Sequence, residues 1–189
     1  MDKSQKGRLD LGERAQVKEA TMEEAMSTTK QALVSQYEKC FNMLAETISK
    51  YDEQLWGNDT DYDSPVWQVV YHALYYANIY CSSTRESIVA WPKAREGYHI
   101  FGKRSSSQPE QLVPQEPYSK GEMVEFLQFV SSNVPTYLDK MKPHDRCWPP
   151  WYEESQLEFQ LNNIRHIQHH IAQVIERHDI AQPFDYKWY

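Results

Sequence analysis

The chain has 189 residues, of which 40% are hydrophobic and 25% are charged, and its formal net charge is -7. This size fits one domain with one core, and no run approaches the ~18 apolar residues of a membrane span. The acidic balance argues against nucleic acid as a main partner, because phosphate contacts need clustered Lys and Arg. The low glycine count of 6 disfavours an all-β fold rich in tight turns.

The cysteines, Cys40, Cys81 and Cys147, lie far apart in the sequence. They form neither a disulfide framework nor a paired zinc motif. The N-terminus is polar and has no apolar signal core. Together these features predict a reducing, cytoplasmic location and do not favour a catalytic cysteine.

Residues 1–20 are charged and almost free of large apolar side chains, so we interpret them as a flexible leader or as the extended start of the first helix. Thr21 and Glu24 have the spacing of a capping box, which predicts a first helix from Thr21 to about Lys50. We find no second domain, and residues 21–189 are expected to form a single one.

The second predicted helix follows the pair Ser64 and Pro65, which suit an N-cap and the first helical position, and it spans about 65–83. The third is predicted from Ser119 to about Met141.

Glu122 completes a capping box with the first residue of this third helix. Pro135 lies inside the helix, where we expect a kink or a break.

Ser155 and Glu158 again have capping-box spacing and begin a fourth helix that ends near His178. The irregular segment 86–118 separates the second and third helices, and a loop of this length in a small domain is usually functional or mobile. The aromatic tail 184–189 is expected to pack against the helices. The pattern predicts an all-α four-helix bundle with a long crossover between helices 2 and 3.

The fourth predicted helix contains His166 and His170, which are four residues apart and therefore share one helix face. At about 100° per residue, both lie at the margin of the apolar stripe, whereas His169 points to solvent. His72 lies at the corresponding margin of the second helix, with Tyr76 beside it. Three imidazoles from two helices could bind one metal ion and leave an open position for water or substrate.

Three other interpretations of the histidines have to be considered. A histidine at a core margin is more often a hydrogen-bonded structural residue than a ligand. Position 167 is Ile, so the pair is not the HExxH of a zinc protease. The Glu-x-x-His spacing of di-iron bundles occurs only at 96–99, in the loop. The other histidines, His99, His144 and His178, lie in predicted loops or at a helix end, where the last of them suits the helix dipole.

The segments 67–74, around His72, and 166–173, with its pattern His-Ile-Gln-His-His-Ile-Ala-Gln, resemble the DinB-like superfamily of metalloenzymes. The resemblance covers about residues 25–178. It implies a four-helix bundle in which His72, His166 and His170 bind a divalent metal, commonly zinc or nickel. Characterised relatives are transferases or isomerases that use low-molecular-weight thiols such as bacillithiol or mycothiol.

The chain departs from the simplest family pattern in three places. Ala172 replaces the usual small Gly before the Gln of the last-helix motif, the segment 86–118 is long, and the aromatic tail is additional. These differences leave the implied ligands intact and bear on the substrate.

We therefore expect a divalent-metal-dependent thiol S-transferase that acts on a small thiol and an electrophile. Tyr76 and Asn163 are candidates for hydrogen bonds near the metal, and no residue is identified as a catalytic acid or base. The alternatives are a non-catalytic binding module of the stress-response type and a metal-dependent hydrolase. A homodimer formed through a helix face is compatible with such a bundle, and neither nucleic acid nor a membrane is an expected partner.

Overall fold

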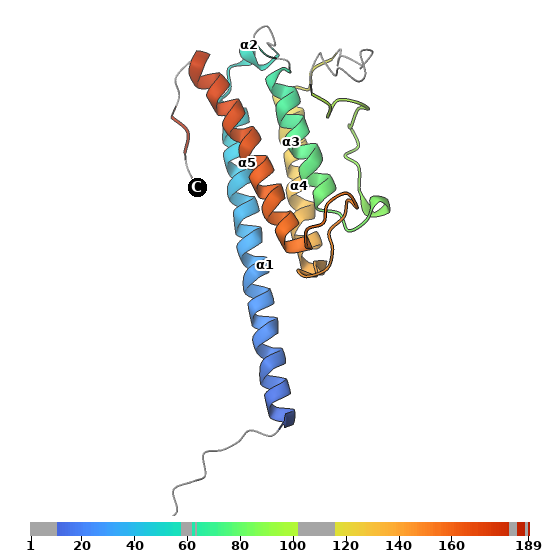
Figure 1. Cartoon of the computed structure of the whole chain (residues 1–189). Coiled ribbons are helices and arrows are strands. Elements are labelled where there is room, and N and C mark those ends of the chain that lie inside the picture. The colour runs from blue at the N-terminus through green and yellow to red at the C-terminus, as the bar shows by residue number, and fades with distance from the viewer. Residues whose placement is uncertain (1–10, 58–61, 63, 102–115, 182–184, 188) are drawn as a thin grey trace, which may run out of the picture.

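The computed structural model describes residues 11–57, 62, 64–101, 116–181, 185–187 and 189. Its helices are α1 (Leu11–Lys50), α2 (Glu53–Trp56), α3 (Val66–Tyr80), the 3-10 turn η1 (Arg85–Ser87), α4 (Lys120–Lys140) and α5 (Gln156–Ala181) (Figure 1). Within these residues the chain forms no strand, and its one isolated β-bridge joins Arg146 to Ser155. The expected all-α class is confirmed.

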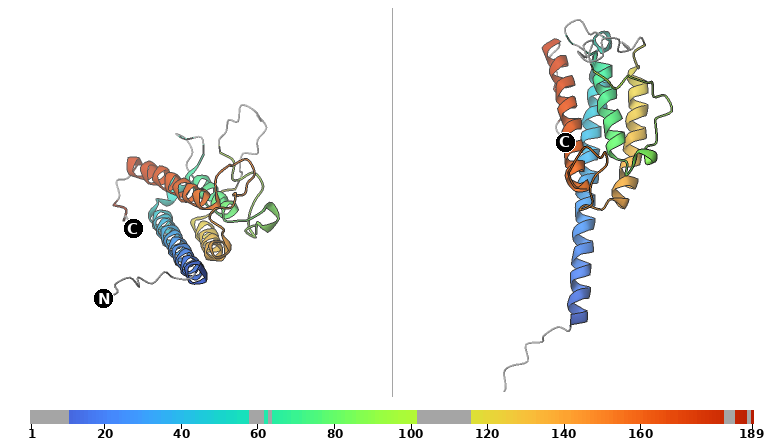
Figure 2. Two further views of the ribbon diagram at one scale, coloured as in Figure 1. Left: turned by 60° about the horizontal axis from the view of Figure 1, so that its bottom comes forward. Right: turned by 45° about the vertical axis from the view of Figure 1, so that its right-hand side comes forward.

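The long helices lie side by side, with α1 packed against α4 and α5, and α3 packed against the same two helices (Figure 2). Each of them contributes large side chains to the shared core, where burial of apolar surface stabilises the fold. The largest fully buried side chains include Tyr37, Leu44, Ile48, Tyr71, Leu74, Tyr118, Phe126, Leu138, Phe159, Ile167 and Ile171. Among the described helices, none has both the length and the apolar character that a membrane crossing needs.

Helix α1 begins at Leu11, so the predicted start at Thr21 is wrong. The hydroxyl of Thr21 donates to the carbonyls of Val17 and Lys18, at 2.9 and 2.8 Å. This is how a threonine inside a helix satisfies its hydroxyl, whereas an N-cap accepts from a backbone N–H. For residues 11–20 the extended helix is therefore correct and the flexible leader is not, while residues 1–10 lie outside the described part of the chain.

The other two capping boxes are confirmed. The Ser119 hydroxyl accepts from the backbone of Glu122, whose carboxylate accepts from the backbone N–H of Ser119. At the start of α5, the backbone N–H of Glu158 donates to the Ser155 hydroxyl at 3.3 Å, and the N–H of Ser155 donates to the Glu158 carboxylate at 3.0 Å. These pairs set where the third and fourth predicted helices begin.

Two helix details differ from expectation. Pro65 is itself the N-cap of α3, which ends at Tyr80, so the predicted range 65–83 is slightly too long. Helix α4 runs through Pro135 to Lys140 without a break. Because Pro135 is exposed, the carbonyl that it leaves without a donor can be hydrated.

The described part of the C-terminal tail packs against α1 and α5, as expected. The Tyr186 hydroxyl lies 2.9 Å from Nδ1 of His178, and the Tyr189 hydroxyl donates to the Glu46 carboxylate at 2.9 Å. His178 lies in the last turn of α5, as expected, and its side chain is buried. The tail residues 184 and 188, and residues 102–115 of the segment 86–118, lie outside the described residues.

Candidate metal centre

Helices α3 and α5 pack together and bring His72, His166 and His170 to one place. One potential ligand atom of each imidazole lies within 4.8 Å of those of the other two. The Nε2 atoms of His166 and His170 are 3.0 Å apart. Nitrogen ligands 2.0–2.1 Å from a tetrahedral zinc ion lie about 3.3 Å apart, so this pair has nearly the spacing that coordination requires.

The three rings enclose a common point at the edge of the core. Their centroids are separated by 5.4 Å between His72 and His166, 4.8 Å between His72 and His170, and 4.5 Å between His166 and His170. His170 is buried, whereas His72 and His166 are half-buried. This agrees with the helical periodicity, which places all three at the margin of the apolar stripes.

A main-chain carbonyl fixes the tautomer of His72. Its Nδ1 lies 2.6 Å from the carbonyl oxygen of His99. Because a carbonyl can only accept a hydrogen bond, Nδ1 must carry the proton. The lone pair of His72 is therefore on Nε2, the nitrogen that remains available to a metal.

The side chain of Gln173 plays the same part for His170. The amide oxygen of Gln173 lies 2.8 Å from Nδ1 of His170. An amide oxygen accepts, so the proton is again on Nδ1 and the lone pair is on Nε2, which faces His166.

His166 shows why a cation fits between the rings. Its Nδ1 is buried and has no hydrogen-bond partner among the described residues. If Nε2 of His166 donates to Nε2 of His170, this Nδ1 is a buried acceptor without a donor, which costs about 1–3 kcal/mol. If both Nε2 atoms carry lone pairs, the two repel unless a cation lies between them. The donor set thus suits a divalent ion.

The three imidazoles are uncharged near neutral pH. Burial, with a smaller contribution from the neighbouring imidazoles, lowers the pKa of His72 to about 4 and the pKa of His166 to about 3. Burial also lowers the pKa of His170. A neutral imidazole is the form that binds a metal ion, so these rings need not lose a proton before the ion binds.

Aromatic side chains wall the site on the side of α3 and the following loop. The ring of Phe101 stacks on His72 with a centroid distance of 3.8 Å and an interplanar angle of 17°. The imidazole of His99 stacks on Tyr75 at 4.0 Å. Tyr76 lies beside His72, as expected, at 4.7 Å between ring centroids. The described part of the long loop therefore covers the histidine cluster.

Three participants were not identified from the sequence: the carbonyl of His99, the ring of Phe101 and the amide of Gln173. A signal existed only for Gln173, because it lies three residues after His170 and so on the same helix face. The loop residues carry no periodicity from which their position could be inferred.

Asn163 does not take the expected place beside the metal ligands. Its amide donates to the carbonyl of Ala77 at 3.4 Å and to Sγ of Cys81 at 3.7 Å. It belongs to a buried polar group in which the Gln160 amide accepts from the Tyr37 hydroxyl at 2.6 Å. Burial raises the pKa of the Cys81 thiol to about 12, which suppresses its reactivity.

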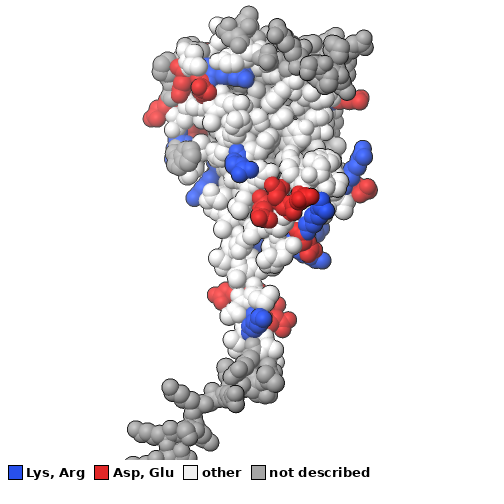
Figure 3. Space-filling view, in the orientation of Figure 1, with Lys and Arg blue, Asp and Glu red and all other residues white. Residues whose placement is uncertain are grey.

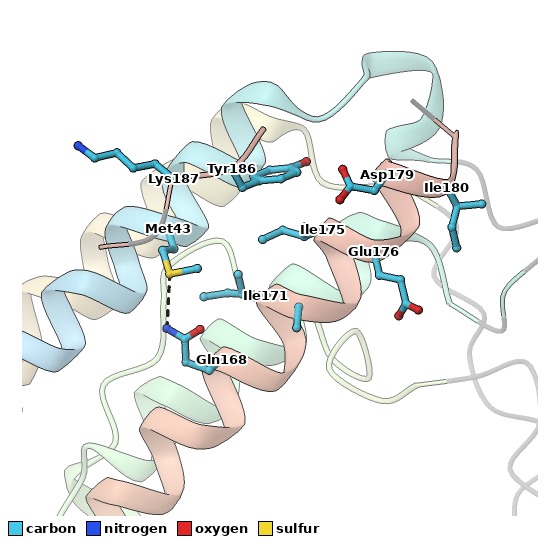
Figure 4. Close-up of a pocket in the computed structure, with 10 residues that line it drawn as sticks. Met43, Gln168, Ile171, Ile175, Glu176, Asp179, Ile180, Tyr186 and Lys187 are labelled. Carbon is cyan, nitrogen blue, oxygen red and sulfur yellow. Dashed lines mark hydrogen bonds between the residues drawn. The ribbon is translucent and has the colours of Figure 1, made fainter. Parts of the chain in front are cut away.

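A separate cavity of about 580 Å³ lies on another face of α5 (Figure 4). Its lining comes from α1, α5 and the C-terminal tail and consists of Met43, Gln168, Ile171, Ala172, Ile175, Glu176, Asp179, Ile180, Tyr186 and Lys187. None of the three clustered histidines lines this cavity, so it is distinct from the candidate metal centre.

Comparison with known proteins gives no relative for this chain: no family model matches it, nor does any curated protein or solved structure.

Proposed function

We propose that the chain is a divalent-metal-dependent enzyme of the DinB-like type that transfers a low-molecular-weight thiol to an electrophile. The observation that carries this proposal is the convergence of three neutral imidazoles, two of which are held with Nε2 directed to one point. Together with the sequence pattern 166–173, it supports zinc or nickel as the ion. The ring of contacts among α1, α3, α4 and α5 supports a four-helix bundle with its crossover between α3 and α4.

The roles of the chain's own groups follow from their contacts. His72, His166 and His170 would be the ligands, and the His99 carbonyl and the Gln173 amide would keep two of them in the correct tautomer. A bound divalent ion lowers the pKa of a coordinated thiol and so supplies a thiolate near neutral pH.

The aromatic residues that wall the site indicate which kind of electrophile it could accept. Phe101 and Tyr76 present apolar faces beside His72 and exclude water from one side of the cluster. An apolar wall strengthens electrostatic interactions at the centre and suits an electrophile with an apolar body. The free, buried cysteines of the described residues accord with a reducing cytoplasm.

Elemental analysis of the purified protein tests the metal site. We expect about one zinc or nickel ion per chain in the wild type and a near-complete loss in His166→Ala. His169→Ala is the matched control, because His169 lies on the same helix and is exposed; it should keep the wild-type content. Equal metal content in the wild type and His166→Ala would refute the ligand assignment.

A second assay separates the proposed transferase from its alternatives. The metal-loaded protein is incubated with small thiols and a model electrophile, and thioether formation is followed. Turnover that needs the thiol supports the transferase, whereas thiol-independent hydrolysis of esters or amides would indicate a hydrolase. Metal binding without either reaction would indicate a non-catalytic module.

A further inference from the structure

Helix α1 extends far beyond the helices against which it packs (Figure 1). It has 40 residues and α4 has 21, which at 1.5 Å per residue correspond to about 60 and about 30 Å. Lys30 donates to the carbonyl of Asp139 at 2.6 Å, near the last turn of α4. Residues 15–25 of α1 are all exposed. We call residues 15–29, which precede this contact, the arm.

The apolar stripe of α1 continues into the arm. Ala15, Met22 and Met26, in steps of seven and four residues, prolong the row that continues at the same spacing with Leu33 and Tyr37 in the core. The same face that packs against α4 and α5 is thus uncovered in the arm. Met22 is 61% exposed there.

An uncovered helix of this length is not stable by itself. Helices of ~12–15 residues are marginal in water, and most helical stability in proteins comes from packing of the apolar face. Without a partner the arm would be helical only through its continuity with the packed half of α1. Packing of its apolar face against a second surface would therefore stabilise the arm.

The charges beside the stripe indicate what that surface is. Lys18, Glu19, Glu23 and Lys30 line an open surface together with the apolar residues of the arm. With Lys30 at its edge, this face carries two basic and two acidic groups and can complement itself, and Figure 3 shows both signs on the projecting helix. A membrane or nucleic acid would require a predominantly basic face.

We propose that the arm pairs with the arm of a second copy of this chain, in antiparallel orientation. A parallel pair would force both sets of packed helices into the same space at one end, because α4 and α5 occupy the stripe side of α1 beyond Lys30. An antiparallel pair separates them, and the register that overlaps residues 12–29 of the two copies places the small Ala15 opposite the large Met26. The arrangement is two-fold symmetric, like most homodimers.

In such a pair, the tip of each arm reaches the base of the other copy. The connector between α4 and α5 lies at this base, and its Trp151 is 72% exposed. A specific interface buries roughly 800 Å² per partner, and two short helices supply only part of that area. Contact with the connector would add to it.

The mass of the full-length protein in solution tests the pairing. By analytical ultracentrifugation at about 50 μM, the wild type should have twice the chain mass of 22.4 kDa, and Met22→Glu/Met26→Glu should have the chain mass. The control Val17→Glu/Thr28→Glu adds the same charges to the opposite face of the arm and should remain a dimer. A monomeric wild type, a dimeric Met22→Glu/Met26→Glu protein, or equal dissociation by the control would each overturn the proposal. Unchanged thermal unfolding of both variants checks that the packed helices are intact.

Cross-linking tests the orientation. The native cysteines are buried, so new cysteines in the arm can be oxidised selectively. A mixture of Ala15→Cys and Met26→Cys proteins should form the mixed disulfide faster than either protein alone forms its own. Preferential disulfides between identical variants would overturn the antiparallel arrangement.

Discussion

Nδ1 of His170 and the side-chain oxygen of Gln173 lie 2.8 Å apart on the same face of α5. One residue thus orients another a single turn earlier on the same helix, without depending on any loop. Because the Gln173 oxygen accepts the proton of Nδ1, the other nitrogen of His170 is directed at His166 and His72.

Removing this acceptor should weaken metal binding and leave the fold intact. Loss of a hydrogen bond that orients a histidine ligand typically lowers metal affinity 10–100-fold, and we expect this effect for Gln173→Leu. Gln168→Leu is the control, since Gln168 lies on the same helix but its amide contacts Cys40 and Met43. Competition with a chromophoric chelator measures both affinities, and equal weakening in the two variants would contradict the proposed role.

The metal-free protein should lose stability as the pH falls. The pKa of His72 is about 4 and that of His166 about 3 in the folded chain, below the ordinary value of 6.5. Between these limits the unfolded chain binds more protons than the folded one, so the free energy of unfolding decreases as the pH is lowered from about 7 towards 4.

Urea unfolding in the presence of a chelator measures this dependence. His166→Leu should have a shallower dependence on pH than the wild type, because one of the histidines whose pKa is lowered by burial is gone. His144→Leu removes an exposed histidine and should behave as the wild type does. Identical pH dependence in the wild type and His166→Leu would show that burial does not depress the pKa of His166.

The stacked ring of Phe101 should shield His72 from reagents. Truncation in Phe101→Ala removes the face that lies 3.8 Å from the imidazole, so we expect diethyl pyrocarbonate to modify His72 several-fold faster. Ile100→Ala changes the neighbouring residue, which is already 39% exposed, and should not alter the rate. Peptide mass spectrometry of the metal-free protein gives the rate at each histidine; equal rates in both variants would mean that Phe101 does not cover His72.

The buried amide of Gln160 should contribute strongly to stability. It accepts from the Tyr37 hydroxyl at 2.6 Å and donates to the Tyr80 carbonyl at 3.0 Å. Gln160→Leu leaves the Tyr37 hydroxyl without its acceptor and the Tyr80 carbonyl without this donor, at about 1–3 kcal/mol for each, so we expect a loss of about 3 kcal/mol in the free energy of unfolding. Gln128→Leu alters an exposed glutamine of α4 and should have little effect in the same denaturation experiment.

The sequence predicted helix starts well only where local chemistry decides them. Ser119 and Ser155 each lie at the end of an irregular segment, and their hydroxyls cap the helices that follow. Thr21 has the same spacing to an acidic residue but lies inside a helix, where its hydroxyl returns to Val17. The capping-box spacing alone cannot distinguish these cases, because the difference lies in whether the residues before the Ser or Thr are already helical.

The site was predictable to the extent that it depends on helical periodicity. The period of 3.6 residues placed His72, His166 and His170 at matching margins, and the structure brings them together. It could not indicate the carbonyl of His99, since a loop has no period, or the burial of His178, which depends on the tail residue Tyr186.

The acceptor for His72 belongs to the polypeptide backbone, and this determines which mutations the loop can tolerate. Replacing the side chain at position 99 leaves the peptide oxygen in place, so a mutational scan should tolerate many residues there. Deleting or inserting a residue between 88 and 99 would shift that oxygen away from Nδ1 of His72. We therefore expect the segment 88–99 to tolerate substitutions better than insertions or deletions.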